Sequence, residues 1–109
     1  MLKSNIFVYI EISKLIANLT LDELTSKKQL QSQAGYFNVL PIKYFSDALA
    51  PEWDAISEDI RRAGPIMDGE GRMIRNAIAN TIDQMTPSEC VKITRRIMAL
   101  FEKLEQEFK

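Results

Sequence analysis

TPSECVKITRRIMALFEKLEQEFK, residues 86–109, is the stretch of sequence that decides the fold. Thr86 suits the cap of a helix, Pro87 its first position, and Glu89 completes a capping box. An apolar stripe then recurs at helical spacing. It consists of Cys90, Ile93, Ile97, Leu100, Leu104 and Phe108, flanked by Met98 and Phe101. We predict a long amphipathic helix that lines the core of a helical protein.

The segment before this helix also has a helical pattern, which we expect to start at Arg72. Its inward face would carry Ile74, Ala77, Ile78, Ile82 and Met85, and its outward face Arg72, Arg75, Asn76, Ala79 and Asp83. Only the link Met85–Thr86 separates the two patterns. The sequence therefore predicts that an antiparallel helix hairpin closes the fold.

The N-terminal segment favours a helix capped by Ser4. Val8, Ile12, Leu15, Ile16 and Leu19 would share one face. The run from Ile6 to Ile10 is also rich in strand-forming residues, so a strand over residues 6–12 is the alternative. We favour the helix because a lone strand needs a partner, and no second strand pattern is clear.

A second capping box is predicted at Thr20-Leu21-Asp22-Glu23. It would start a surface helix from Leu21 to about Ala34 with a thin apolar face of Leu21, Leu24 and Leu30. Gly35 would end that helix in the left-handed conformation.

Prolines and glycines divide the middle of the chain. Pro41 makes Tyr36–Lys43 a connector, and residues 44–49 are expected to form one or two helical turns. Pro51 suits the first position of a further helix, which buries Trp53, Ile56 and Ile60 and stops at Gly64-Pro65. Ile66–Gly71 is then a loop.

Together these patterns predict an all-α fold, a single compact bundle of about five helices that forms one domain over residues 1–109.

The composition excludes several classes of function. The chain has 109 residues, of which 46% are hydrophobic and 27% charged, as in ordinary globular proteins. It has no histidine, which removes Ser-His-Asp and Cys-His chemistry and nearly all zinc sites. We therefore expect a protein that is not an enzyme and uses no cofactor or metal. The single cysteine, Cys90, is expected to be buried in the core.

The same totals give an expected location. A lone cysteine cannot form an internal disulfide, which favours a reducing compartment. No apolar run approaches the roughly 20 residues of a membrane span, and no signal peptide is recognisable. We expect a cytoplasmic protein.

The charge layout is the main functional signal. Residues 44–70 carry a net charge of −5, whereas the rest of the chain carries +4. The seven acids are Asp47, Glu52, Asp54, Glu58, Asp59, Asp68 and Glu70, and Tyr36, Phe37, Tyr44, Phe45 and Trp53 lie in or beside the segment. We predict an acidic docking face, with Tyr44 among its anchors, that steers a basic partner into place. The alternative is an ordinary solvated helix surface.

Two local patterns within this segment have plainer explanations. Gly69-Glu70-Gly71 lacks the lysine and hydroxyl of a phosphate-binding loop. Asp54 and Glu58, one turn apart, could share a proton or a cation, but Glu58 also precedes Arg62 by four residues, the spacing of a surface ion pair. We interpret both patterns as solvent-exposed structure.

In size, helical content and the acidic stretch from Asp47 to Glu70, the chain resembles the small helical immunity proteins of contact-dependent growth inhibition systems. That resemblance implies a toxic partner domain, often a nuclease, whose active site the protein would block. It implies no particular site residues, because these immunity proteins share no universal motif.

Two alternative functions remain open: a small regulator that binds nucleic acid, and an enzyme that uses Asp, Glu, Arg or Tyr side chains alone, for which no pattern selects the residues. Basic residues of the last two predicted helices could contact nucleic acid phosphates: Arg72, Arg75, Lys92, Arg95 and Arg96. The sequence pI of about 5.5 and the lack of interleaved aromatic residues argue against this hypothesis. Separately, Val91, Met98 and Phe101 broaden the apolar face of the last helix, which would suit a homodimer.

Overall fold

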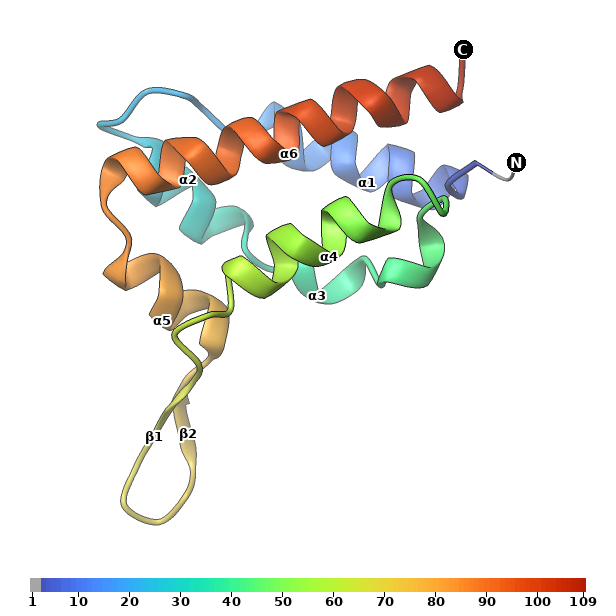
Figure 1. The fold of residues 1–109 in the computed structure, drawn as a ribbon. Coiled ribbons are helices and arrows are strands. Elements are labelled where there is room, and N and C mark those ends of the chain that lie inside the picture. Colours follow the sequence, from blue (N-terminus) through green and yellow to red (C-terminus); the bar gives the residue numbers. More distant parts are fainter. Residues whose placement is uncertain (1–2) are drawn as a thin grey trace.

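The computed structural model describes residues 3–109 as one helical bundle with a projecting two-stranded ribbon (Figure 1). The helices are α1 (Ile6–Ala17), α2 (Ser26–Gln33), α3 (Tyr36–Val39), the 3-10 turn η1 (Ile42–Tyr44), α4 (Ala50–Asp59), α5 (Ala77–Gln84) and α6 (Pro87–Glu107). The ribbon pairs β1 (Ile66–Met67) with β2 (Met73–Arg75). Five of these helices have eight residues or more, so the predicted all-α bundle is confirmed.

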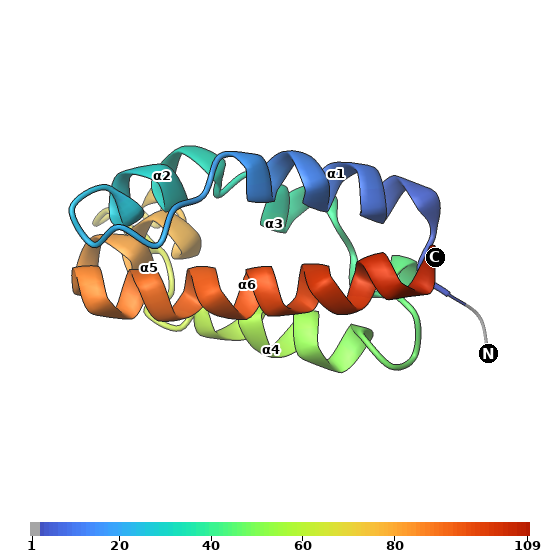
Figure 2. The ribbon, with the colours of Figure 1, turned by 90° about the horizontal axis from the view of Figure 1, so that it is seen from above.

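The long helix α6 is the spine of the bundle. Its capping box forms as predicted: Thr86 Oγ1 accepts from Glu89 N at 3.1 Å, and Glu89 Oε1 accepts from Thr86 N at 2.9 Å. Its stripe from Cys90 to Leu104 is buried. Seen from above, α1 and α2 follow one side of α6 and α4 the other (Figure 2), so three helices cover the apolar face.

Helix α1 confirms the helical prediction for residues 6–12 and corrects its cap. Asn5, not Ser4, accepts from Val8 N, at 2.9 Å. Ser4 is buried and ties the chain ends together, because its backbone N–H donates to Glu107 Oε1 at 2.8 Å and its hydroxyl accepts from Ser46 N. Burial opposes ionisation of Glu107, but hydrogen bonds from Ser46 and Ser4 outweigh it and lower the pKa of that carboxyl group.

Trp53 of α4 anchors the other side of the core. Its ring stacks between Phe37 and Phe45, with centroids 4.9 and 5.3 Å away. Its indole N–H donates to Leu40 O at 2.9 Å, which satisfies the one polar atom of the buried side chain.

Helix α4 starts at Ala50, so Pro51 is its second residue rather than its first. The predicted connector around Pro41 contains the short turns α3 and η1.

The predicted helix from Leu21 is wrong over its first five residues. Thr20 Oγ1 accepts from Asp22 N instead of capping a helix, and Asp22 Oδ1 accepts from Leu24 N. These turns delay the helix until Ser26, and Leu24 is 93% exposed. Gly35 has φ −58°, so it does not take the left-handed conformation predicted for it.

The predicted helix start at Arg72 is also wrong. Residues 66–75 form the ribbon, and Asn76 caps α5 by accepting from Ala79 N at 2.8 Å. Gly64, with φ +72°, turns the chain out of the α4 region. Across the Met85–Thr86 link the chain reverses direction between α5 and α6, as predicted for the end of the fold (Figure 1). The two helices are not packed along each other as a hairpin, because α5 packs mainly on α2 whereas α6 packs on α1, α2 and α4.

Candidate protein-binding site

Four of the seven acids predicted to form a docking face are paired with basic side chains. Glu52 Oε1 lies 2.7 Å from Lys103 Nζ, and Asp59 Oδ2 lies 2.6 Å from Arg96 Nη1. Both pairs join α4 to α6. Asp68 and Glu70 both contact Arg72, at 3.0 and 2.9 Å, at the tip of the ribbon. Glu52 and Asp59 are each offset by one cation, whereas Asp68 and Glu70 share Arg72 and keep one net negative charge.

The remaining three acids are Asp47, Asp54 and Glu58. Asp47 lies exposed in the turn before α4, apart from the other two. Asp54 and Glu58 stand one turn apart on α4, and both line an open groove of about 430 Å³ between α4 and the α3–η1 segment. The structure therefore brings together two of the predicted acids, not seven.

The groove combines an apolar floor with an acidic wall. Phe37, Leu40 and Trp53 are buried beneath it, while Pro41 and Ile42 form an exposed apolar rim. Within residues 3–109 neither Asp54 nor Glu58 belongs to an ion pair, and the predicted Glu58–Arg62 pair does not form. The groove can therefore accept a cationic side chain that has an apolar stem.

Arg61 closes one end of this groove and brings one positive charge to it, but it forms no ion pair with Asp54 or Glu58 within residues 3–109. Its guanidinium donates to Phe37 O at 2.9 Å, Asn38 Oδ1 at 3.2 Å and Ser57 O at 3.1 Å. The planar group is thus held by neutral oxygens of the α3 and α4 segments. Arg61 fixes α3 against α4 and keeps the groove in shape.

Tyr44 lies at the edge of the bundle rather than in the groove. It is half-buried and meets the Phe7 ring edge-on, with centroids 6.1 Å apart. Its backbone carbonyl accepts from Asn5 N at 3.0 Å. The ring packs against the core, so the main role of Tyr44 is to hold η1 against α1.

The ribbon is a second exposed feature, which the sequence patterns did not predict. Ile66, Met67, Met73 and Ile74 are between 39% and 65% exposed. Asp68 closes the tip, since its Oδ1 accepts from Glu70 N and Arg72 N, and Gly71 adopts φ +82°. These backbone donors and the Arg72 guanidinium lower the pKa of Asp68. Two apolar pairs around a Gly-x-Gly turn were the available hairpin signal.

The base of the ribbon is fixed to α5. Thr81 Oγ1 accepts from Ala63 N at 3.0 Å, and Asn80 Nδ2 donates to Gly64 O at 2.8 Å. Both side chains are buried. These two hydrogen bonds hold the base of the ribbon against α5, and the ribbon projects away from the bundle (Figure 1).

The basic residues considered for nucleic acid binding are mostly neutralised. Arg72 pairs with Asp68 and Glu70, Arg75 with Asp83, and Arg96 with Asp59. Lys92 lines a hollow of about 280 Å³ beside Arg62 and the paired Arg96, together with Asp59 and Glu89. Arg95 is exposed on α6. The five side chains are not collected into one basic face.

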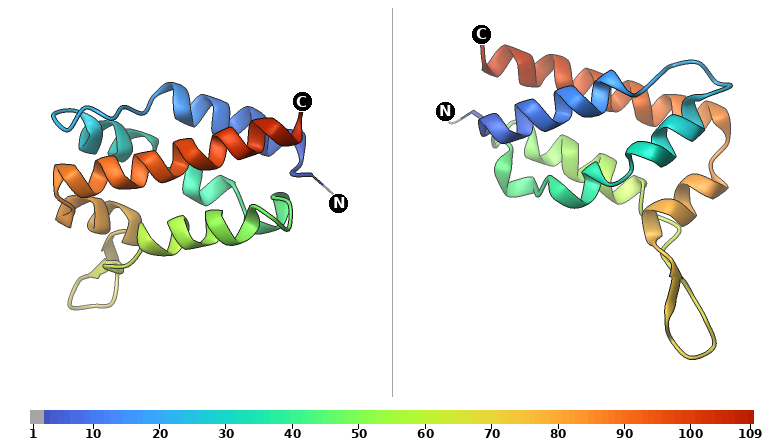
Figure 3. Two further views of the ribbon diagram at one scale, coloured as in Figure 1. Left: turned by 45° about the horizontal axis from the view of Figure 1, so that its top comes forward. Right: turned by 180° about the vertical axis from the view of Figure 1, so that it is seen from behind.

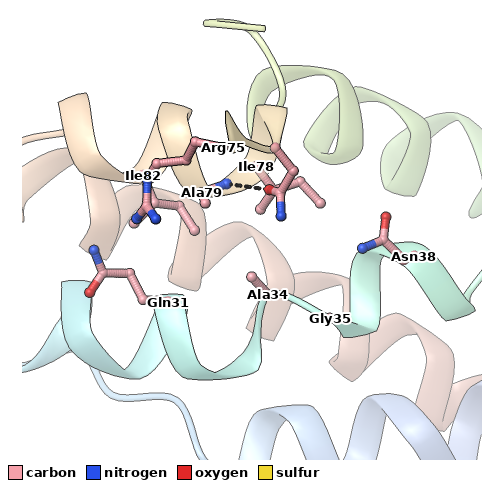
Figure 4. A pocket seen from close by; sticks show the side chains of 9 residues that line it. Gln31, Ala34, Gly35, Asn38, Arg75, Ile78, Ala79 and Ile82 are labelled. Carbon is pink, nitrogen blue, oxygen red and sulfur yellow. Dashed lines mark hydrogen bonds between the residues drawn. The ribbon is translucent and has the colours of Figure 1, made fainter. Parts of the chain in front are cut away.

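Another hollow, of about 350 Å³, lies between α2, α3 and α5 (Figure 4). Its polar side chains are already engaged. Gln31 and Arg75 bond Asp83, Asn76 caps α5, and Asn38 accepts from Arg61. The hydrogen bonds within the protein leave this hollow little capacity for an outside ligand.

The described residues give little support for a reactive cysteine, a metal site or a membrane-spanning helix. Cys90 is fully buried, and desolvation raises the pKa of its thiol, which disfavours the reactive thiolate. Within residues 3–109 no group of three or more acidic or cysteine side chains is placed to hold a metal ion. No helix in the same range is long and apolar enough to cross a membrane.

Comparison with protein-family models, curated proteins and solved structures finds no match to this chain.

Proposed function

We propose that this chain is a cytosolic binding protein that neutralises a basic protein partner, as an immunity protein blocks a cognate toxin such as a nuclease. The α3–α4 groove carries the proposal. It places Asp54 and Glu58, two carboxylates that form no ion pair within the described residues 3–109, above an apolar floor. Such a groove suits a lysine or arginine of the partner.

The binding mode follows from the groove's two halves. The aliphatic stem of the partner's side chain would lie along Pro41 and Ile42, while its charged head would reach Asp54 and Glu58. Charge attraction increases the rate of encounter, and burial of the apolar stem slows dissociation. The exposed ribbon adds apolar contact area elsewhere on the molecule, in Ile66, Met67, Met73 and Ile74.

The test mixes this chain with the product of the neighbouring gene, which the proposal expects to carry a toxic domain. We expect a complex by gel filtration and rescue of growth when the two are produced together. Asp54→Asn combined with Glu58→Gln should weaken binding by about 10- to 100-fold and reduce its salt dependence, because the cationic side chain loses both partners.

Glu23→Gln combined with Glu102→Gln is the matched control. Both residues are exposed and neither lines the groove, so the pair removes the same charge without changing the groove wall. Absence of any complex would count against the immunity function. Equal weakening by the control pair would show that only net charge matters and would reject the groove.

The nucleic acid alternative stays a proposal with less support, because Arg72, Arg75 and Arg96 are ion-paired. Its test is a mobility shift at low salt that fades as salt is added. No shift at about 50 mM salt would reject it.

A further inference from the structure

Helix α1 has an apolar face that no other segment of residues 3–109 covers. All but three of its 12 residues are apolar, the exceptions being Glu11, Ser13 and Lys14. Helices that are apolar all round are normally buried on every side. Here only the inner face is buried, through Val8, Ile12 and Leu15.

The opposite face of α1 carries a continuous stripe. Ile6, Ile10, Ser13 and Ala17 follow one another at spacings of four, three and four residues, which keeps them on one side of the helix. Ile6 is 56% exposed and Ile10 48%, and Phe7 beside them is 43% exposed. Ser13 donates its hydroxyl to Tyr9 O at 2.7 Å, so that polar group is satisfied within the helix.

This face lies on an outer edge of the molecule. Figure 2 shows α1 and α4 on opposite sides of α6, and Figure 3 shows α1 from behind, away from the ribbon. An occupant of this face would leave both the α4 groove and the ribbon accessible. The surface is therefore separate from the proposed partner site.

We infer that the outer face of α1 packs against the same face of a second copy of this chain, in antiparallel orientation. The order of side-chain sizes along the stripe favours this occupant. Two large residues, Ile6 and Ile10, come first, and two small ones, Ser13 and Ala17, follow. A two-fold axis midway between Glu11 and Ile12 sets Ile6 against Ala17 of the second copy. The same axis sets Ile10 against Ser13.

Each large side chain then faces a small one, so the two helices approach closely along their whole length. A parallel pair would instead oppose Ile6 to Ile6 and Ala17 to Ala17, forcing the helices apart at one end. The order of side-chain sizes along the stripe thus favours a second copy of this chain as the partner, with its α1 antiparallel to the first.

Charges on this face permit self-association. Lys14 is paired with Glu11 of its own helix at 2.9 Å, so the surface carries no net charge from these residues. In the antiparallel arrangement Lys14 approaches Phe7 of the second copy, where a cation–π contact would form. Apolar area without net charge suits a second copy better than a highly charged partner.

The interface is small, which sets the strength of the dimer. A 12-residue helix is about 18 Å long, and a pair of such faces buries roughly 600–800 Å² in total. Stable complexes bury about 1,200–2,000 Å². We therefore expect a dissociation constant on the order of 10–100 µM rather than an obligate dimer.

Sedimentation velocity over about 5–500 µM protein tests the proposal, a range chosen to bracket the expected dissociation constant. The dimer fraction should rise with concentration. Ile10→Lys should raise the dissociation constant at least about tenfold, because it places two charges in the apolar seam. Leu24→Lys, on a side chain 93% exposed outside the stripe, makes the same charge change and should leave the dimer intact.

The antiparallel direction has its own test. When an Ile10→Cys chain is mixed with a Ser13→Cys chain and oxidised, the mixed disulfide should form fastest. Dominance of the Ile10→Cys homodisulfide would overturn the antiparallel arrangement. The natural Cys90 is fully buried and should stay reduced.

Three further outcomes would overturn the proposal. The first is a chain that stays monomeric up to about 500 µM, well above the expected dissociation constant. The second is a dimer that survives Ile10→Lys, which would place the interface elsewhere. The third is a monomer that co-sediments with phosphatidylcholine–phosphatidylglycerol vesicles and loses that binding in Ile10→Lys. That result would make a lipid surface the occupant.

Discussion

Residues 20–23 and 86–89 both read Thr-x-x-Glu, yet they hold the chain in different ways. At Thr86 the threonine and Glu89 exchange hydrogen bonds and start α6. At Thr20 the hydroxyl accepts from Asp22 N, and the helix begins only at Ser26. The contrast shows that a capping motif starts a helix only where the residues after it can bury an apolar face.

The residues after each motif explain the difference. After Thr86 come seven buried side chains on one helix, so the helix gains a large apolar area by forming there. After Thr20 the next leucines, Leu21 and Leu24, have no core to enter, and α2 buries only Ser26 and Leu30. Asp22 adds local competition, because its carboxylate and carbonyl oxygens bond the backbone ahead.

The largest expected effect comes from removing the burial that supports α6. Ile97→Ala should lower the free energy of unfolding by about 2–5 kcal/mol, because Ile97 is fully buried in the core. Leu24→Ala, in the other segment, should change it by less than about 0.5 kcal/mol. Urea unfolding followed by circular dichroism measures both. Similar losses for the two variants would contradict this explanation.

A smaller effect is expected from the caps themselves. Thr86→Ala removes the acceptor for Glu89 N and should cost about 1 kcal/mol of unfolding free energy. Thr20→Ala removes only an exposed turn bond and should cost a few tenths of a kcal/mol. Comparing the two by urea unfolding isolates the cap from the side-chain change. Equal costs would mean that the Thr20 turn is as important as the α6 cap.

The smallest effect is the pH dependence of the capping box. The Thr86 N–H donated to Glu89, helped by the Thr86 side chain, lowers the pKa of this carboxyl group. A lowered folded pKa contributes stability that is complete above the unfolded value of about 4.3 and is lost as the pH falls through the folded pKa. Glu89→Gln should therefore flatten the decline in stability below that pH.

Glu23→Gln is the control for this measurement, since Glu23 belongs to the segment that forms no capping box. Thermal unfolding of both variants and the wild type between about pH 3 and pH 6 brackets the relevant range. A pH profile for Glu89→Gln that overlays the wild type would show that the box contributes nothing measurable.

The helices that the sequence predicted well are those with both a local signal and a complete apolar stripe. Helix α6, the inner face of α1 and the Trp53 face of α4 meet this condition. The prediction that a helix starts at Arg72 was wrong because Ile74 fits the spacing of the apolar stripe of α5. In the structure Ile74 lies on the ribbon and is 65% exposed. Helical spacing alone does not reveal whether a core is present to receive the side chain.

The candidate site was predictable only in part. Asp54 and Glu58 could be identified as an i, i+4 acidic pair on a helix. Their groove could not, because its apolar wall comes from Leu40, Pro41 and Ile42, which reach it through tertiary packing. The pairing of Asp59 with Arg96, 37 residues away, was equally invisible to local sequence patterns.

The sequence by itself determined the helical class, the cap and buried stripe of α6, and the lack of histidine chemistry. These depend on residue types and on spacings within a few helical turns, where hydrogen bonding and side-chain direction are local. Only the tertiary structure decided which capping motif forms, which carboxylates keep their charge unpaired, and which face of α1 is left uncovered. Those outcomes depend on burial and on ion pairs between segments distant in the chain.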